Sequence, residues 1–417
     1  MSFSATGDRF AAFRHISYVR FFFARFLISF ATQIISVSVG WQMYDETRNA
    51  VYLGLIGLVQ FLPSLLLVLV TGVVADRYNR RAIAAICIVV ATLCSGALLL
   101  LTVTGSFSPL PVFLILVVFG IERAFMQPAV ASLAPNLVPA QDLPNAVAWN
   151  SSSWQTAAIL GPVAGGLLYG IGASYAYLVA LVFSAVSAVL TFMIAKPAQH
   201  STNATTWHSI LAGYRFIRSE KVVLGAISLD LFAVLLGGAV ALMPIYARDI
   251  LTLGPWGLGF LRGAPGLGAI AMALFLATYP IRNRAGVYMF TGVAFFGVGT
   301  LVFGLSHTPW LSMVALVLMG ASDMISVYVR ETLIALWTPD HVRGRVNAVN
   351  MVFVGASNEL GEFRAGMMAW GFGAVPAVVI GGVGTLAVAI IWSLGFPQLR
   401  KIDTLDAPER EGEPQPA

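Results

Sequence analysis

Runs of about twenty apolar residues, separated by short polar turns, fill most of the 417-residue chain. Each run is long enough to cross a hydrocarbon layer roughly 30 Å thick as an α-helix. The pattern therefore predicts a protein that spans a membrane many times. We place twelve helices at residues 18–43, 51–75, 82–103, 111–134, 146–170, 174–195, 222–247, 254–280, 286–305, 309–336, 346–370 and 374–396.

The amino-acid composition agrees with a membrane protein. Hydrophobic residues make up 58% of the chain and charged residues 10%, whereas soluble globular domains have about a quarter of their residues charged. The N-terminal residues lack the cleavage pattern of a secretory signal, so we expect the first hydrophobic helix to remain in the protein. The basic residues form no continuous patch, which excludes nucleic acid as an expected partner. The expected surroundings are the lipid bilayer.

Basic residues are concentrated on alternate connections between the predicted helices. Most lie on one set of connections: the N-terminus, the turns near 76–81, 282–284 and 343–345, the central connection and the C-terminus. The connections at the other ends of the predicted helices hold Arg48 and Arg248 only. Basic loops stay on the cytoplasmic side of a membrane. Both termini are therefore predicted to be cytoplasmic, in the plasma membrane or, if the protein is bacterial, in the inner membrane.

The chain divides into two similar halves. Residues 1–195 and 222–396 each hold six predicted helices, with a central cytoplasmic connection at 196–221 and a polar cytoplasmic tail at 397–417. Apolar residues at helical spacing in the central connection predict an interfacial helix. A shift of 200 positions superposes identical residues of the two halves, among them Gly54 and Gly254, Gly120 and Gly320, Asn150 and Asn350, and Gly161 and Gly361. Such a repeat is typical of transporters.

Two short motifs point to a known family. The charged stretch "GVVADRYNRR" at 72–81 resembles the signature loop of the major facilitator superfamily. The stretch "AAILGPVAGG" at 157–166 resembles the helix-five signature of antiporters in that superfamily, with Ala157 in place of the first glycine. Longer stretches, such as "GWQMYDET" at 40–47, are similar to the enterobactin-exporter-like branch. The resemblance implies an all-α polytopic membrane protein with twelve transmembrane helices in two pseudo-symmetric six-helix bundles, the major facilitator fold.

The resemblance also implies a role for the charged loop. In the superfamily this loop is a cytoplasmic latch between conformational states, and we carry that role to Gly72, Asp76, Arg77 and Arg81. The alternative is a charge cluster that only orients the chain in the membrane. Asn79 is expected to take a positive φ in the turn, which asparagine tolerates better than most residues.

The helix-five block combines small residues with a proline. Proline removes a backbone donor and glycine removes bulk, so the block predicts either a kink that packs closely or a hinge. The residues concerned are Gly161, Pro162, Gly165 and Gly166.

Two acids inside the predicted helices are candidates for proton coupling, which requires a carboxyl that gains a proton on one face and loses it on the other. Asp230 lies near the middle of the seventh helix, and its basic neighbour along the chain is Lys221, at the membrane surface. We therefore expect Asp230 to be the coupling group, with Asp323 next, because Arg330 lies two helical turns from Asp323. The alternative for Asp230 is a structural acid, satisfied by a hydroxyl or an arginine of another helix.

Further charges within helices are expected to form ion pairs, because an unpaired charge in hydrocarbon costs at least a few kcal/mol. Glu359 and Glu362 share one face of the eleventh helix, and Arg330 or Arg364 is expected to neutralise them. Glu122 and Arg123 are adjacent on the fourth predicted helix. Adjacent residues of a helix point about 100 degrees apart, so we expect each of the two to have a partner on another helix.

Together these features predict a secondary active transporter that exports a small organic molecule, siderophore or drug-like, by alternating access and in exchange for protons. Proton-coupled uptake of a small metabolite is the alternative within transport. An ion channel is the alternative outside it, although no filter sequence is visible. The sequence contains no hydrolase or metalloprotease motif and no ATP-binding glycine loop. We therefore expect no enzymatic activity, no metal and no cofactor, an ion gradient as the driving force, and function as a monomer.

Overall fold

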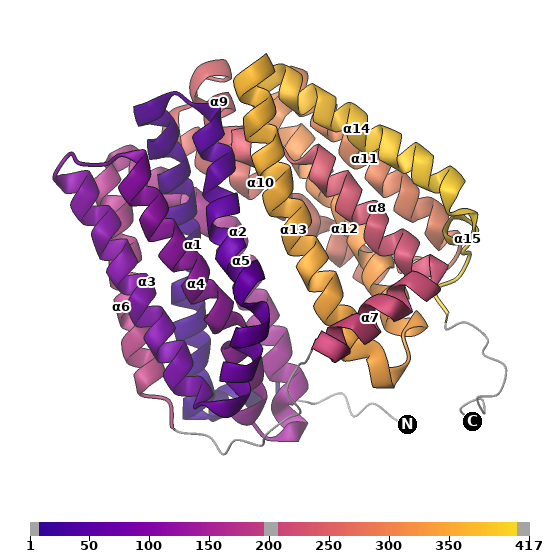
Figure 1. The fold of residues 1–417 in the computed structure, drawn as a ribbon, viewed down its shortest axis with the longest axis horizontal. Coiled ribbons are helices and arrows are strands. Elements are labelled where there is room, and N and C mark those ends of the chain that lie inside the picture. The colour runs from indigo at the N-terminus through magenta and orange to yellow at the C-terminus, as the bar shows by residue number, and fades with distance from the viewer. Residues whose placement is uncertain (1–7, 196–206, 407–417) are drawn as a thin grey trace. The chain divides into compact units, whose positions relative to one another are not determined.

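The computed structural model describes residues 8–195 and 207–406, and within these ranges the chain forms helices and turns without β-strands (Figure 1). The long helices of the first half are α1 (Ile16–Thr47), α2 (Ala50–Arg77), α3 (Arg80–Val103), α4 (Pro109–Leu133), α5 (Leu143–Ile171) and α6 (Ala173–Phe192). Those of the second half are α8 (Lys221–Gly237), α10 (Gly254–Thr278), α11 (Ala285–Leu305), α12 (Pro309–Trp337), α13 (Asp340–Phe372) and α14 (Ala374–Gly395). The all-helical, polytopic fold class is confirmed.

Ten described segments are long and apolar enough to cross a bilayer. The other two predicted spans are α5 and α13, which form helices of 29 and 33 residues but have a more polar composition. The polar run "NSSSWQT" at 150–156 lowers the hydropathy of α5, and several charged residues lower that of α13. Polar helices of this kind are stable in a membrane where their polar faces meet protein or water.

The seventh predicted span is interrupted, so the prediction of one continuous helix over 222–247 is wrong. α8 ends at Gly237, and the chain continues through η4 (Val240–Leu242), α9 (Met243–Ile245) and the π-helix η5 (Tyr246–Ile250). Two consecutive glycines, Gly237 and Gly238, stand at the interruption. Glycine loses more backbone freedom in a helix than any other residue, which favours a break there.

The amphipathic segment of the central connection forms a helix, α7 (Trp207–Ser219), as predicted. α7 packs against α13, where Gly213 lies directly over the backbone of Arg345. Ile217 is buried, whereas Arg215 and Arg218 are exposed. The rest of the predicted connection, 196–206, and tail residues 407–417 lie outside the described residues.

The helices group into two contact units. The first comprises Met1–Thr205 together with Val240–Gly266, and the second comprises Thr206–Ala239 together with Leu267–Ala417. These units follow the sequence halves except in Val240–Gly266, which belongs by sequence to the second half and by packing to the first. The chain passes between units next to Gly238 and next to Gly266.

Helix packing is repeated between the units. α1 packs on α5 and α6 in the first unit, and α8 packs on α13 and α14 in the second; α3 contacts α4 and α6 just as α11 contacts α12 and α14. The glycines of the sequence repeat take part in this. A Cβ on Gly161 would lie 2.6 Å from Gln33 of α1, and one on Gly361 would lie 3.0 Å from the Val234 carbonyl of α8.

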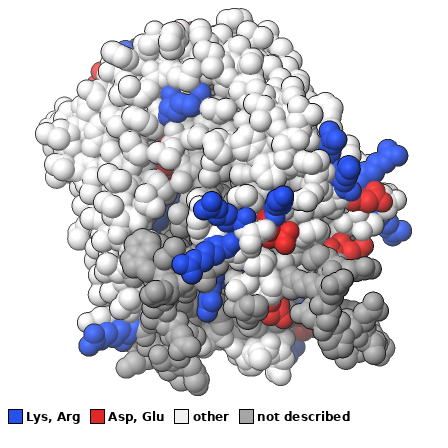
Figure 2. All heavy atoms as spheres, turned by 45° about the vertical axis from the view of Figure 1, so that its right-hand side comes forward, with Lys and Arg blue, Asp and Glu red and all other residues white. Residues whose placement is uncertain are grey.

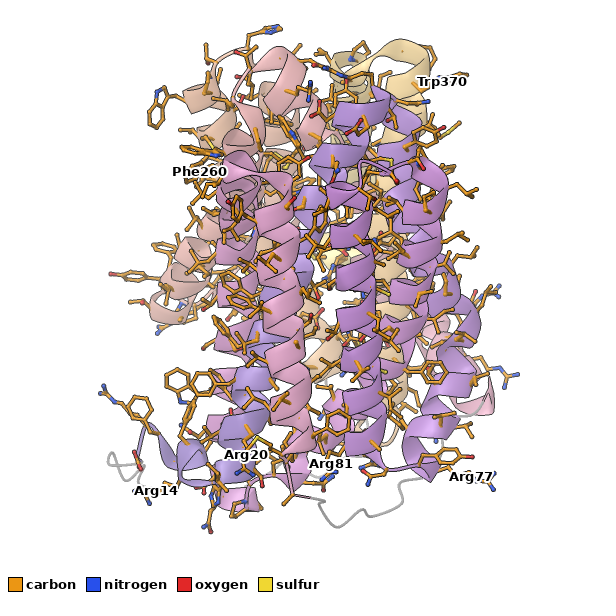
Figure 3. All side chains as sticks on the ribbon, turned by 90° about the vertical axis from the view of Figure 1, so that its left-hand side faces the viewer. Arg14, Arg20, Arg77, Arg81, Phe260 and Trp370 are labelled. Carbon is orange, nitrogen blue, oxygen red and sulfur yellow. The ribbon has the colours of Figure 1, made fainter. Side chains whose placement is uncertain are left out.

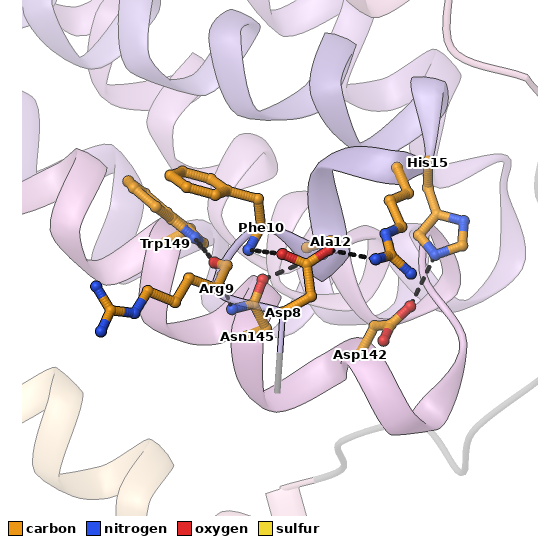
Figure 4. Close-up of polar contacts among 9 residues, drawn as sticks. Asp8, Arg9, Phe10, Ala12, His15, Asp142, Asn145 and Trp149 are labelled. Carbon is orange, nitrogen blue, oxygen red and sulfur yellow. Dashed lines mark hydrogen bonds and ion pairs between the residues drawn. The ribbon is translucent and has the colours of Figure 1, made fainter. Parts of the chain in front are cut away.

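The N-terminal residues pack on the start of α5 through η1 (Ala11–Arg14) (Figure 4). The Ala12 N–H donates to Asn145 Oδ1 at 3.1 Å, and Trp149 Nε1 donates to the Arg9 carbonyl at 3.0 Å. His15 Nε2 lies 2.8 Å from Asp142 Oδ2. These contacts hold the residues before α1 against the start of α5.

Charged side chains are sparse on the molecular surface. On the face drawn in Figure 2, most of the surface is uncharged, and the Lys and Arg side chains gather at a few places, several of them with Asp or Glu side chains alongside. In the first unit, Arg14, Arg20, Arg77 and Arg81 lie at one end of the helices, as Figure 3 shows. This is the end at which α1 begins and α2 ends.

Candidate functional site

Asp230 and Arg330 form a buried ion pair in the second unit. Asp230 lies on α8 and contacts Arg330 Nη1 on α12, and the two side chains are 9% and 5% exposed. This contact matches the alternative left open for Asp230, an acid satisfied by an arginine of another helix. Sequence neighbours of Asp230 along α8 could not reveal this contact, because it joins residues a hundred positions apart on different helices.

Two more polar groups extend this pair. Glu331 Oε1 lies 3.4 Å from Arg330 Nε and accepts a hydrogen bond from Asn350 Nδ2 of α13 at 3.2 Å. Asn350 is one of the residues that coincide in the sequence repeat. The cluster thus joins α8, α12 and α13, three helices that the repeat makes equivalent to α1, α4 and α5.

Asp323 belongs to the same cluster but does not form the kind of ion pair that joins Asp230 to Arg330. It lies on α12 two turns before Arg330 and is close enough to Asp230 and Arg330 to experience both charges. In the part of the chain that the structure describes, Asp323 has neither an ion pair nor a hydrogen bond. A carboxyl without a fixed arginine is freer to exchange its proton. These contacts favour Asp323 over Asp230 as the candidate coupling group, and the coupling role of either residue stays a prediction.

Arg364 lies on α13, where it satisfies backbone carbonyls at the interruption of the seventh span. Its Nε donates to the Leu235 carbonyl at 2.9 Å and its Nη2 donates to the Leu236 carbonyl at 2.5 Å. The last carbonyls of a helix have no partner within the helix. Arg364 therefore caps α8, a role that differs from the predicted neutralisation of Glu359 and Glu362.

The expectation that Arg330 is free to neutralise Glu359 and Glu362 also changes, because its guanidinium is engaged by Asp230 and Glu331. Both glutamates lie on α13 and both have interaction partners. Their predicted role in intramembrane ion pairing stays a prediction.

In the first unit, Glu122 and Arg123 are neighbours on α4, where Glu122 is partly buried. The Glu122 carboxyl is close enough to the buried Cys87 and Cys94 of α3, a helix that packs on α4, for its charge to act on both thiols. The Arg123 side chain is exposed and has an interaction partner. The predicted role of the two residues in intramembrane ion pairs with other helices stays a prediction.

The charged stretch at 72–81 is mostly helical in the structure, because α2 runs to Arg77 and α3 begins at Arg80. Asn79 has a φ of −65°, so the expected positive φ is wrong; its side chain instead accepts hydrogen bonds from the Arg81 and Ala82 N–H groups at the start of α3. Arg81 Nη1 donates to the Ile194 carbonyl at 2.6 Å, beyond the end of α6. Cations near helix C-termini are stabilising.

The latch role itself stays a prediction. The Asp76 side chain lies outside the described residues, Arg77 is exposed, and Gly72 is half-buried within α2. Arg80, which the predicted latch does not include, is only 5% exposed and donates to the Ala75 carbonyl at 3.3 Å.

The glycines of the helix-five block face two different helices. A Cβ on Gly165 would lie 3.0 Å from the Ile34 Cα of α1. A Cβ on Gly166 would lie 2.6 Å from the Pro255 carbonyl and 2.8 Å from the Gly259 Cα of α10. α5 continues through the buried Pro162 without a break. The block thus lets the backbones of α1 and α10 approach α5 closely, and whether it also bends stays a prediction.

A second polar cluster lies at the far end of α1 in the first unit. Arg248 of η5 forms an ion pair with Asp45, and Arg48 Nη1 lies 3.1 Å from Asp249 Oδ1. Tyr44 donates to Asp249 Oδ2 at 2.5 Å. The pairs are crossed: each segment contributes one acid and one arginine.

The fold agrees with the known relatives of the chain. A family described as transmembrane secretion effector matches residues 7–417. The chain belongs to this family of the major facilitator superfamily. The enterobactin exporter EntS of Escherichia coli O127:H6 is 26% identical over 400 residues, covering 93% of each chain, and that of Shigella boydii serotype 18 has the same identity and coverage.

Solved structures of the superfamily share the fold. A bacterial homologue of the human lysosomal transporter Spinster, inward-facing and unoccupied, matches with a TM-score of 0.71 and 13% identity, covering 94% of this chain and 97% of that one. A D-xylose–proton symporter matches with a TM-score of 0.70 and 14% identity, covering 92% and 98%. The chain is therefore a multi-pass membrane transporter, and its relatives are transporters rather than enzymes.

The crossed ion pairs are what the sequence reasoning missed in this family member, although a signal was present. Arg48 and Arg248 are the two arginines that stand apart from the alternating basic pattern, and each lies next to acidic residues in "YDETR" and "ARDI". On the connections opposite the predicted cytoplasmic side, basic residues are rare. Where such a residue stands beside acids, it indicates an ion pair rather than a signal that orients the chain in the membrane.

We expect Gly166→Ala to destabilise the protein. The added methyl group meets backbone atoms of α10, which cannot rotate away as a side chain would, so we expect a loss of about 1–3 kcal/mol. Thermal unfolding in detergent, followed by fluorescence-detected size exclusion, measures it. Gly344→Ala on α13 is the control: nothing lies within 4 Å of its Cβ, and alanine favours the helix by roughly 0.5–1 kcal/mol. Equal melting temperatures for both variants would contradict the close α5–α10 contact.

Proposed function

We propose that the protein is a secondary active transporter that exports a small organic molecule in exchange for protons, by alternating access of its two halves. The observation that carries the export part is the similarity to enterobactin exporters over nearly the whole length of both chains. A siderophore, or a drug-like molecule of similar size, is the substrate class that this similarity supports.

Proton coupling is supported by the cluster in the second unit. Its three carboxyls face one arginine, so the cluster holds more acid than base, and Asp323 lacks a fixed partner within the described ranges. Protonation of Asp323 would reduce the negative charge beside the Asp230–Arg330 pair, and deprotonation would restore it. Such a change alters the balance between packing arrangements of α8, α12 and α13.

The proposed setting follows from the same reasoning. The protein lies in the plasma membrane, or in the inner membrane of a bacterium, with both termini and the 72–81 loop on the cytoplasmic side, as the distribution of basic residues favours. It acts as a monomer with the ion gradient as its energy source and needs no cofactor or metal. Gly72, Asp76, Arg77 and Arg81 form the proposed cytoplasmic latch.

Two other functions make different predictions. Proton-coupled uptake of a metabolite would move substrate in the same direction as protons rather than in the opposite direction. An ion channel would let its solute equilibrate but never accumulate. The direction of gradient-driven accumulation therefore separates all three.

Transport into inside-out membrane vesicles with an acidic lumen tests the proposal. We expect iron-free enterobactin, or a cationic dye in a parallel series, to accumulate in the lumen until a protonophore collapses the gradient. A difference of one pH unit corresponds to about 1.4 kcal/mol per proton, or tenfold accumulation. Vesicles without the protein are the control. Accumulation only when the external medium is acidic would indicate uptake, and equilibration without accumulation would indicate a channel.

A further inference from the structure

The N-terminal ends of α3 and α11 are capped in different ways, although the two helices occupy equivalent places in the repeat. α3 is capped locally, because Asn79 accepts hydrogen bonds from the N–H groups of Arg81 and Ala82. The connection before α11, residues 279–284, contains two arginines and no acid. Its last residue, Arg284, has only donor groups in its side chain and cannot cap the helix as Asn79 does. The first N–H groups of a helix have no partner within it, so α11 needs acceptors from elsewhere.

These acceptors come from the end of the chain, in residues 397–406, which we call the C-terminal strap. Asp403 accepts twice: its Oδ1 from the Arg284 N–H at 2.8 Å, and its carbonyl from the Ala285 N–H at 3.0 Å. The Ile402 carbonyl accepts from the next N–H along α11 at 3.0 Å. Asp403 lies 119 positions after Arg284. Three successive N–H groups at the start of α11 are thus satisfied by one distant segment, and an acidic side chain at a helix N-terminus is stabilising.

Glycines on α11 and α8 make room for the strap. It begins with α15 (Pro397–Arg400), which follows α14 and contacts α8, α11 and α14 (Figure 1). A Cβ on Gly286 of α11 would collide with the Leu399 carbonyl oxygen. A Cβ on Gly225 of α8 would lie 2.8 Å from Phe396 Cδ1 and 3.2 Å from Leu399 Cδ2. The strap therefore lies directly against the starts of both helices.

Apolar residues at every third position anchor the strap. Leu399 is fully buried, and Ile402 and Leu405 are partly buried against the same hydrophobic cluster as Trp337 at the end of α12. Trp337 Nε1 also donates to the Asp406 carbonyl at 3.2 Å. The strap thus joins the ends of α8, α11 and α12, which no other described residues after α14 do.

The outer part of the strap is held less firmly than its anchor. Lys401 and Asp403 are exposed, and Ile402 and Leu405 are only half-buried. Segments with few buried apolar contacts and solvent-exposed hydrogen bonds open locally at low cost in free energy. The part of the strap that caps α11 is therefore suited to docking and release, while Leu399 keeps it attached.

The strap is also connected to the residues beside Asp230. Its neighbour Phe396 stacks on Trp392 of α14, with ring centroids 6.3 Å apart. Trp392 Nε1 donates to Ser228 Oγ at 2.9 Å, and the Trp392 and Phe232 ring centroids are 5.0 Å apart. Ser228 and Phe232 stand two positions before and after Asp230 on α8. A change at the strap therefore reaches α8 next to the buried ion pair.

We infer that the C-terminal strap supplies the cap that α11 lacks, and that its docking and release are a conformational switch of the second unit. When it is docked, the strap holds the starts of α8 and α11 together. When it is released, three N–H groups of α11 turn to water and the two helix ends open more readily. The switch goes beyond the proposed function, because it sets the freedom of the second unit whichever way a substrate moves.

Hydrogen–deuterium exchange of the purified full-length protein in detergent tests the cap without substrate. We expect Asp403→Ala to raise the exchange rate of the amides at 284–286 on the order of fivefold, the usual effect of removing a helix cap, and to leave the amides at 81–82 unchanged. The matched variant is Asn79→Ala, which should raise the rate at 81–82 and leave 284–286 unchanged. This crossed result separates loss of one cap from a general loss of stability.

Gly286→Ala tests the switch, because the added methyl group displaces the strap without altering it. We expect exchange at the start of α11 to rise on the order of tenfold and exchange at the start of α8, residues 222–228, to rise with it. Gly395→Ala is the control: it lies two residues before α15, and nothing lies within 4 Å of its Cβ, so both regions should exchange at the wild-type rate.

Two truncations locate the effect in the strap. Deletion of 402–417 should reproduce the exchange pattern of Gly286→Ala, whereas deletion of 407–417, which removes no residue of the strap, should leave the wild-type pattern. Wild-type exchange at 284–286 after deletion of 402–417 would overturn the cap. Faster exchange confined to α11, with α8 at the wild-type rate, would overturn the switch. None of these measurements involves transport, so their failure is distinct from failure of the proposed function.

Discussion

Replacing Arg330 by glutamine is expected to lower the free energy of unfolding by about 3–5 kcal/mol, because it leaves the Asp230 carboxylate buried without its cation. Both side chains of the pair are almost inaccessible to solvent, so water cannot take over the interaction. The double variant Arg330→Gln with Asp230→Asn should recover most of the loss, since removing both charges of a buried pair is often close to neutral. Denaturant-induced unfolding in mild detergent measures all three free energies.

The exposed ion pair of Arg343 and Asp340 on α13 is the control for this cycle. Its side chains are 45% and 88% exposed, so Arg343→Gln should cost less than about 1 kcal/mol. If Arg330→Gln costs no more than Arg343→Gln, or if the double variant is as unstable as the sum of the single ones, the buried pair does not stabilise the second unit as we infer.

Replacing Asp323 by asparagine is expected to abolish accumulation driven by a pH gradient while leaving exchange of substrate across the membrane within about twofold of the wild type. The reason is that asparagine keeps the shape and polarity of the side chain but cannot bind and release a proton. Under a gradient of one pH unit, the wild type should accumulate substrate about tenfold per coupled proton, whereas the variant should reach only equilibration. Transport into inside-out vesicles measures both quantities.

The matched variant is Asp230→Asn, which alters the same cluster but removes the partner of Arg330. We expect it to lower stability as well as transport, and so to impair exchange, whereas Asp323→Asn should impair only the coupling. Gradient-driven accumulation by Asp323→Asn at the wild-type level would exclude Asp323 as the coupling group. Loss of coupling with intact exchange in Asp230→Asn would restore the order predicted from the sequence.

The number and nature of the helices could be read from the sequence because a bilayer imposes a simple rule. A span needs about twenty apolar residues whatever it packs against. A different signal located α7: it is an interfacial helix of 13 residues, and its apolar residues recur at helical spacing. The rule failed over 222–247, where hydropathy continues through Gly237 and Gly238 although the helix does not. Hydropathy measures transfer into lipid and is insensitive to a local change of backbone conformation.

For the charged groups, the positions along the chain were visible in the sequence but the partners were not. The sequence located the acids and arginines inside the spans, and the cost of burying charge required that they find partners. It did not determine which ones, because Asp230 and Arg330 meet across two helices, and Arg364 meets backbone carbonyls that exist as acceptors only where α8 is interrupted. The crossed pairs of Asp45, Arg48, Arg248 and Asp249 likewise depend on packing between the end of α1 and η5.

The sequence by itself determined the membrane class, the two six-helix halves and the family, since these depend on composition, on hydropathy at the scale of one helix and on motifs contiguous in the chain. Only the tertiary structure decided the partner of Asp230, the cap on α8 and the assignment of Val240–Gly266 to the first unit. These features depend on distances between residues far apart in the sequence, which are set by the packing of helices through positions such as Gly166 and Gly259. A one-dimensional pattern specifies which faces must be buried, and the three-dimensional packing selects what each buried group meets.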